Sequence, residues 1–295
     1  MEMVEVTKAP LAQRLIGSGL LFTRRAVVRA LWIARPRLPG FLLRPYVDRK
    51  VAAALADDGV VDDARMHMEH LLGAIGRSSE IEDASRGYIE HWTRFEELKW
   101  RPRLVTRQAV EGAEHLRAAH ALGRGVLLSF VHHAQYDGIF ASVARATGLP
   151  VKVVAADRAA PGPNLFQHYR VVGSGGGLIS AAVGIAGLVE ELEGGAVVAS
   201  AIDVPGSSVT TCAGRNVKCS SGPARSATLA GAPVVMLTSH RGPDGPIIRL
   251  GEPMLPEDFG SVDELLQEMV RQHEGPLLEW PEVAYLPTVC WRPVD

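Results

Sequence analysis

Four short apolar runs, separated by helical segments, limit the fold of this chain more than any other feature. The runs lie at residues 125–131, 150–156, 196–202 and 233–239 and are rich in valine, alanine and leucine. Runs of this length are typical of strands buried on both faces, and helical segments between them are typical of crossovers joining parallel strands. The sequence therefore predicts an α/β fold with a central, mostly parallel sheet flanked by helices.

The segment before these runs is predicted to be helical. Residues 36–47 hold three prolines and a glycine and predict a break in the chain, and apolar residues at three- and four-residue spacing then predict helices over 48–75 and 80–100. The expected organisation is a single domain, 1–295, made of a basic amphipathic arm (1–47), a helical segment (48–103) and an α/β catalytic core (104–295).

The N-terminal arm differs in charge from the rest of the chain. Residues 7–47 contain eight cations and no acid, whereas the remainder has 23 cations and 33 acids. Arginines interrupt every apolar stretch of the arm, so no span of the ~18–20 apolar residues needed to cross a membrane is expected. We predict a cytoplasmic protein whose arm contacts the anionic inner face of the cell membrane peripherally. The alternative is an amphipathic helix packed on its own domain.

The cysteines limit the chemistry. There are three, an odd number, and no two have CxxC spacing. This pattern argues against a disulfide framework and against a zinc site, so we expect a reducing compartment and no metal. No cofactor and no nucleic-acid partner are expected.

A histidine and an acid follow the first apolar run. His132 comes directly after residues 125–131, and Asp137 lies in the first turn of the next predicted helix. Ligands of open α/β sheets bind beyond the carboxyl ends of the strands, and a histidine held by a carboxylate is a competent general base. Two other interpretations stay open. The histidine could be a core residue bonded to a nearby acid, or HHAQYDG could be an HHxxxDG motif in which His133 is the base.

The sequence around these residues resembles a known family. "VEGAEHLRAAHALGRGVLLSFVHHAQYD" (110–137) is similar to the late lipid A acyltransferases and the related phosphatidylinositol mannoside acyltransferases, members of the lysophospholipid acyltransferase superfamily. Further blocks follow in the same order at 157–170, 175–177, 190–206 and 213–235, so that the resemblance covers roughly residues 80–240. Ordered blocks are more specific than any single motif.

The resemblance implies a reaction and a set of residues. Such an enzyme moves an acyl group, typically fatty, from coenzyme A or acyl carrier protein to a hydroxyl, or to an amine, of a lipid, glycolipid or natural-product acceptor. It implies His132 as the base and Asp137 as its partner in a His-x4-Asp dyad. The residues it implies for substrate binding are Arg158, Asn164, Asp203 and Arg215.

The sequence also departs from the family. Cys212 and Ala213 stand where an aromatic pair is usual, and the tail at 285–295 matches poorly. Two alternatives to the proposed reaction therefore remain: an enzyme of the chloramphenicol acetyltransferase or condensation type using HHxxxDG, and a non-catalytic lipid-binding protein of the same fold. The glycines at 173–177 are expected to form a turn before a helix over 178–192.

Overall fold

The computed structural model describes residues 39–98, 105–155 and 174–285. The chain divides into two compact units, residues 1–46 and 47–295, and the first unit is described only over residues 39–46. The predicted basic arm, 1–47, therefore lies almost entirely outside the described residues. Among the described residues, no helix is both long and apolar enough to cross a bilayer.

The segment predicted to be helical forms three helices: α2 (Gly40–Leu55), α3 (Asp58–Leu72) and α4 (Ile81–Leu98). The break predicted at 36–47 is wrong after residue 39, because α2 continues through Pro45. Pro45 is the sixth residue of α2, so the helix forms around a residue that donates no backbone hydrogen bond. The single helix predicted over 48–75 is also wrong, because Asp57 caps a new helix by accepting from the N–H groups of Gly59 and Val60.

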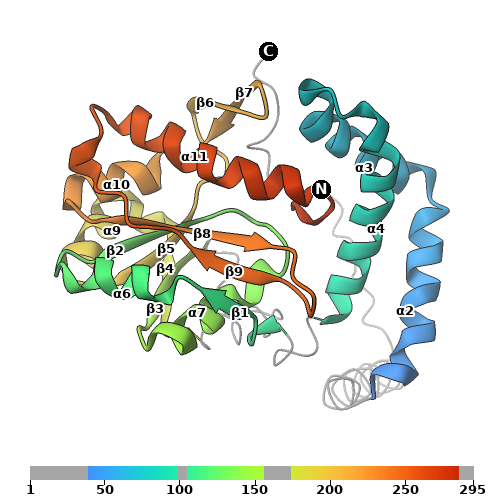
Figure 1. Cartoon of the computed structure of the whole chain (residues 1–295), viewed down its shortest axis with the longest axis horizontal. Coiled ribbons are helices and arrows are strands. Elements are labelled where there is room, and N and C mark those ends of the chain that lie inside the picture. The colour runs from blue at the N-terminus through green and yellow to red at the C-terminus, as the bar shows by residue number, and fades with distance from the viewer. Residues whose placement is uncertain (1–38, 99–104, 156–173, 286–295) are drawn as a thin grey trace, which may run out of the picture. The chain divides into compact units, whose positions relative to one another are not determined.

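The second unit is built on a seven-stranded sheet in the order β1-β9-β8-β2-β5-β3-β4 (Figure 1). Neighbouring strands are parallel except β8 and β9, so the predicted mostly parallel sheet is confirmed. The strands are β1 (Ala109–Glu111), β2 (Val126–Phe130), β3 (Val151–Ala155), β4 (Gly175–Ser180), β5 (Val197–Ala201), β8 (Val234–His240) and β9 (Ile247–Leu250).

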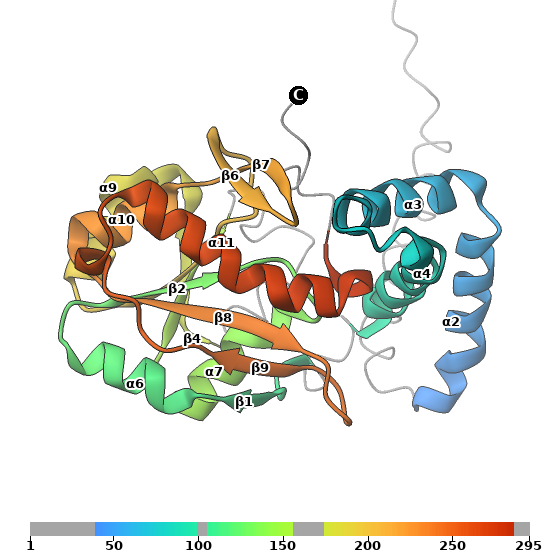
Figure 2. The same cartoon turned by 45° about the horizontal axis from the view of Figure 1, so that its top comes forward.

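Helices cover both faces of this sheet, and the alternation of strand residues explains why. On β2, Leu127 packs against the core that includes α9, α10 and α11, whereas Val126 and Leu128 pack against the core that includes α6 and α7. Figure 2 shows α11 running across one face while α6 and α7 lie on the other. These helices are α6 (Ala113–Ala121), α7 (Ile139–Thr147), α9 (Gly184–Glu193), α10 (Gly222–Ala230) and α11 (Val262–Glu279).

Smaller elements complete the unit. The antiparallel hairpin β6 (Ser208–Cys212) and β7 (Arg215–Cys219) is joined to α11 by the Gln267 side chain, which binds the backbone of Thr211 through both its amide nitrogen and its oxygen. Single-turn helices occur at η2 (Gly73–Ile75), η3 (Ser78–Glu80), η4 (Tyr136–Gly138), η6 (Ala181–Val183), η7 (Pro256–Asp258) and η8 (Pro281–Val283).

All four apolar runs form strands, as predicted: β2, β3, β5 and β8. The prediction for the glycine-rich stretch is wrong. Instead of a turn followed by a helix over 178–192, residues Gly175–Ser180 form strand β4, and α9 begins only at Gly184. Gly176 explains why glycine is used here, because a Cβ at this position would lie 2.3 Å from the carbonyl carbon of Val151 on the paired strand.

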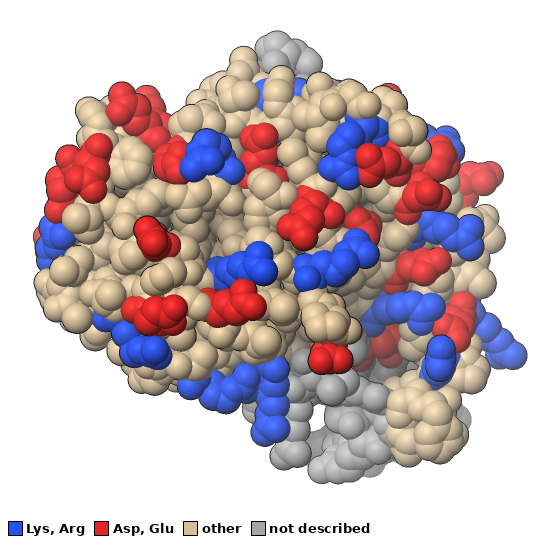
Figure 3. All heavy atoms as spheres, viewed as in Figure 1, with Lys and Arg blue, Asp and Glu red and all other residues tan. Residues whose placement is uncertain are grey.

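Charged side chains of both signs are interspersed over the face shown in Figure 3. Ion pairs of the described residues include Arg124 with Glu257, Arg249 with Glu111, and Arg241 with Glu282. Exposed pairs of this kind contribute little to stability, typically about 0–1 kcal/mol each.

Candidate active site

The carboxyl ends of β2 and β5 bring His132 and Asp203 together. The two strands are parallel neighbours, with Phe130 opposite Ala201, so the residues two positions further on are also opposite each other. Nδ1 of His132 lies 2.8 Å from Oδ1 of Asp203, and the backbone N–H of His132 donates to Oδ2 at 2.7 Å. Both carboxylate oxygens therefore face the same residue, and the carboxylate fixes the position of the imidazole.

The pair is largely removed from solvent, but not equally. The Asp203 side chain is 1% exposed and the His132 side chain is 18% exposed, so the carboxylate is buried beneath an imidazole that still reaches solvent. Because Nδ1 donates to a carboxylate, it carries the proton and Nε2 holds the free lone pair. Nε2 makes no hydrogen bond to the described part of the chain, and it is therefore available to accept a proton.

The charges around His132 adjust its basicity. Burial, the largest single influence, disfavours the imidazolium, but the charge and hydrogen bond of Asp203 and the charge of Asp137 outweigh it, so the pKa of His132 is raised above its usual value. Asp137 lies in the η4 turn that follows His132. Two carboxylates thus act on one histidine: Asp203 through a direct hydrogen bond, and Asp137 through its charge.

Aromatic rings surround the imidazole of His132. The ring of Tyr136 lies edge-on with its centroid 4.7 Å from that of His132, and Phe130 lies 5.6 Å away. Tyr285 lies 6.2 Å from His132 and 4.8 Å from Trp92, which α4 contributes. The helical segment therefore supplies part of the wall next to the candidate base.

His133 has a different environment. Its side chain is buried, and its Nε2 donates to the carbonyl of Trp280 at 3.0 Å. Burial lowers the pKa of His133 to about 4. Its backbone forms a bridge with Ala284, and the flanking bonds run from Ala134 N to Val283 O and from Tyr285 N to His132 O. The side chain thus holds the end of α11, and this geometry favours His132 over His133 as the base.

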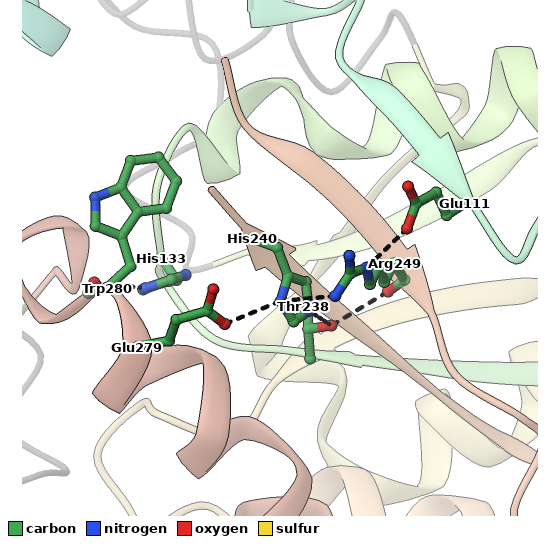
Figure 4. Close-up of polar contacts among 7 residues, drawn as sticks. All are labelled: Glu111, His133, Thr238, His240, Arg249, Glu279 and Trp280. Atoms are coloured by element: carbon green, nitrogen blue, oxygen red, sulfur yellow. Dashed lines mark hydrogen bonds and ion pairs between the residues drawn. The ribbon is translucent and has the colours of Figure 1, made fainter. Parts of the chain in front are cut away.

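Figure 4 shows His133 beside Trp280, at the end of α11 where Glu279 contacts His240. The His240 ring in turn lies within hydrogen-bonding distance of Thr238 (3.0 Å) and Arg249 (3.4 Å). Arg249 donates to Glu111 at 2.7 Å. This network connects α11 with the neighbouring strands β8, β9 and β1, and it is separate from the His132–Asp203 pair.

Of the other predicted site residues, two lie outside the described structure and two lie within it. Arg158 and Asn164 lie outside the described residues. Arg215 begins β7, and a Cβ on Gly73 would lie 3.4 Å from its guanidinium. The guanidinium forms no hydrogen bond or ion pair with the described residues. Asp203, which the resemblance implied for substrate binding, contacts His132.

Several residues of the family-like blocks have structural positions. Gly112 adopts a left-handed conformation (φ 74°) at the start of α6, where a Cβ would lie 2.2 Å from the carbonyl oxygen of Leu250. Nδ1 of His115 lies 2.9 Å from the same oxygen. Gly222 and Gly231 lie at the two ends of α10. These residues therefore shape the scaffold around the site.

The signal that links His132 to Asp203 is present in the sequence. Each is the first residue after an apolar run, 125–131 for His132 and 196–202 for Asp203. If those two strands are neighbours in register, the two residues must meet. The aromatic wall had no such signal, because Trp92 and Tyr285 are far from both runs in the sequence.

The chain has similarity to solved structures but not to protein family models or curated proteins. No protein family model matches the sequence, and no curated protein matches it. Among solved structures, the chain is similar to the crystal structure of the 1-acyl-sn-glycerophosphate acyltransferase PlsC from Thermotoga maritima. The identity is 18%, the TM-score is 0.39, and the match covers 64% of this chain and 82% of that one.

Proposed function

We propose that this protein is an acyltransferase that moves an acyl group from a thioester of coenzyme A or acyl carrier protein to a hydroxyl, or an amine, of an acceptor. The observation that carries the proposal is the His132–Asp203 pair at the carboxyl edge of a parallel sheet. It is supported by the ordered sequence blocks that resemble the lipid A and phosphatidylinositol mannoside acyltransferases.

In this mechanism Nε2 of His132 accepts the proton of the acceptor hydroxyl as its oxygen attacks the thioester carbonyl carbon. Asp203 keeps the proton on Nδ1 and stabilises the imidazolium that forms. The tetrahedral intermediate then collapses, the C–S bond breaks, and the departing thiolate takes the proton back from Nε2. The enzyme is thereby returned to its starting state, and a thioester supplies enough reactivity for this step without a covalent acyl-enzyme.

Asp137 and Arg215 have supporting roles in this proposal. Asp137 completes the predicted His-x4-Asp dyad as a second carboxylate that makes His132 more basic. Arg215 is a candidate ligand for a phosphate of the donor or acceptor, since its guanidinium forms no ion pair with the described residues. We assign the same role to Arg158 and a substrate-binding role to Asn164 on the resemblance alone.

The acceptor class we propose is a lipid, a glycolipid or a natural-product intermediate. A membrane-bound acceptor would suit the basic segment 7–47, which we propose contacts an anionic membrane peripherally. Co-sedimentation of the full chain with vesicles of anionic lipid tests this contact. Binding to anionic vesicles but not to zwitterionic ones is the expected result.

The reaction is tested by thiol release from acyl-coenzyme A of several chain lengths, and by transfer of labelled acyl groups from acyl carrier protein, with candidate acceptors present. The variants are His132→Ala and His133→Ala. We expect His132→Ala to lose at least ~100-fold in turnover while His133→Ala, if folded, keeps most of it. The reverse order would favour the HHxxxDG mechanism. Lipid binding without turnover from either donor would indicate a non-catalytic protein.

A further inference from the structure

The turn at residues 135–138, between His132 and α7, is hydrogen-bonded to Gln108, a residue distant in the sequence that has no role in the proposed mechanism. Gln108 lies just before β1 and is 6% exposed. Its amide nitrogen donates to the carbonyl of Gln135 at 3.0 Å and to the carbonyl of Val105 at 2.8 Å. Because both partners are carbonyls, the nitrogen and not the oxygen of the amide must face them.

A second arm reaches the same turn. The backbone N–H of Gln108 donates to Oγ of Ser142 at 3.0 Å, and that hydroxyl donates to the carbonyl of Gly138 at 3.1 Å. The two ends of the turn, Gln135 and Gly138, are thus both tied to Gln108. The turn carries Asp137 between them.

The 135–138 turn also packs tightly against Val105 and cannot move closer to it. Gly138 lies against Val105 so closely that a Cβ would be 1.8 Å from the Val105 carbonyl oxygen. On the other side, Ala134 holds a left-handed conformation (φ 52°), which is unfavourable for a residue with a side chain. Such a conformation persists only where the surroundings determine it.

The chemistry of Gln108 argues against a role in stability alone. Its side-chain oxygen is buried and accepts no hydrogen bond from the part of the chain that the structure describes. An unpaired buried acceptor costs roughly 1–3 kcal/mol, and an apolar side chain of the same shape would avoid that cost. An amide at this position is therefore explained by its two donated bonds, one of which goes to the turn.

We propose that Gln108 is a positioning residue of the active site, which clamps the 135–138 turn and so fixes the position of the Asp137 carboxylate relative to His132. An effect of Gln108 on turnover rests on the proposed function. The clamp itself can be tested without any substrate, because Asp137 acts on His132 through charge.

The groups that face His132 are few in the described structure. Asp203 contacts its ring directly, Asp137 acts from the η4 turn, and the tyrosines at 136 and 285 border it. Asp203 is held at the end of β5 and does not depend on Gln108. Loosening the turn should therefore remove the Asp137 contribution and leave that of Asp203.

The test is an NMR titration of His132 in the full chain labelled at its histidine rings, with the signal assigned by its loss in His132→Ala. In Gln108→Met, which keeps the shape but removes both donors, we expect the pKa of His132 to fall below its wild-type value. Ser142→Ala removes the hydrogen bonds that link Gln108 to Gly138 with little change in volume. It should also lower the pKa of His132. If Gln108→Met does not fold, the His132 titration in Ser142→Ala tests the proposal.

The matched control is Gln267→Met, which removes a similar amide clamp from the β6–β7 hairpin. It should leave the His132 titration as in the wild type. A His132 titration unchanged in Gln108→Met and in Ser142→Ala, even with a lower melting temperature, would overturn the proposal.

Turnover gives an independent readout. Where a thioester substrate is accepted, Gln108→Met should lower kcat with little change in KM. Absence of turnover in the wild type would count against the proposed function but not against the clamp, since the titration reports on the clamp alone.

Discussion

His132 and Asp203 face each other because each stands two positions beyond the last residue of neighbouring parallel strands. Phe130 and Ala201 are paired across β2 and β5, and the same 71-residue offset joins the histidine to the carboxylate at 2.8 Å. The geometry of the pair is therefore a property of the sheet, and the connecting loops do not determine it.

Replacing the carboxylate should impair the base severely. Asp203→Asn keeps the shape of the side chain but removes the charge that favours the imidazolium, and its amide can donate to Nδ1, reversing the tautomer. We expect turnover to fall by at least ~100-fold, with a smaller loss for Asp137→Asn, because Asp137 contributes less than Asp203 to the raised pKa of His132. Steady-state kinetics of the two variants measure this. A larger loss of turnover for Asp137→Asn would indicate that Asp137, and not Asp203, orients the imidazole of His132.

The pH dependence of activity should follow His132. The residue accepts a proton only when neutral, and its pKa lies above the usual value. Activity should therefore be low on the acid side and rise as the pH passes upward through this raised pKa. In Asp137→Asn the pKa of His132 should fall, so the acid limb of the kcat/KM profile should move to lower pH. An acid limb that does not move would show that another group controls it.

Buried histidines should make the fold sensitive to acid. Burial lowers the pKa of His91 and of His133 to about 4 and that of His273 to about 3. In the unfolded chain these groups take up protons near pH 6.5, whereas in the folded chain they stay neutral until the lower values. Stability should thus be intact above about pH 6.5 and fall steadily as the pH drops toward 4, by several kcal/mol in total.

The melting temperature measured against pH tests this. His273 lies 3.5 Å from Ser129 through Nε2 and is fully enclosed, so His273→Gln keeps a polar partner while removing the titration. The variant should lose less stability between pH 7 and pH 4 than the wild type does, whatever its stability at pH 7. Identical slopes would contradict the prediction.

Two glycines before β2 provide a matched pair for a steric test. Gly123 (φ 73°) and Gly125 (φ 65°) both have left-handed backbones, but only at Gly125 would a Cβ collide, 2.3 Å from the carbonyl oxygen of Leu192. Gly123→Ala should cost about 1–2 kcal/mol from backbone strain alone. Gly125→Ala should cost clearly more, roughly 3 kcal/mol or above, because β2 must shift. Urea unfolding of both variants gives the difference, and equal costs would show that the collision relaxes.

The two described cysteines should be unreactive in the folded protein. Both are buried, and burial raises the pKa of Cys212 to about 12 and that of Cys219 to about 11. The thiolate, which is the reactive form, is therefore scarce at pH 8. Iodoacetamide followed by peptide mass spectrometry should find neither residue modified until urea unfolds the chain. Modification of the native protein would mean that the β6–β7 hairpin opens readily.

The parts of the fold that sequence reasoning predicted are those with local signals. The four apolar runs became strands because burial on both faces requires them to be apolar throughout. Strand β4 escaped prediction because its first three residues are glycine, which carries no periodic pattern. The helix break at Asp57 was missed because its signal is a single capping side chain within an otherwise helical pattern.

The candidate site was predicted unevenly for the same reason. His132 stands out because it directly follows a recognisable strand, whereas its contact with Asp203 depends on strand order, which sequence patterns leave open. Gln108 and Trp92 give no local sign at all. Their positions result from packing between segments distant in sequence, and only a three-dimensional structure shows them.

The 71-residue offset between His132 and Asp203 also has a consequence for biosynthesis. A nascent chain that has emerged from the ribosome as far as β4 already contains the histidine, but it lacks β5 and the carboxylate that binds the histidine. β5 lies between β2 and β3 in the sheet, so it must insert between strands made before it. The protein therefore cannot acquire this pair until translation has passed residue 203.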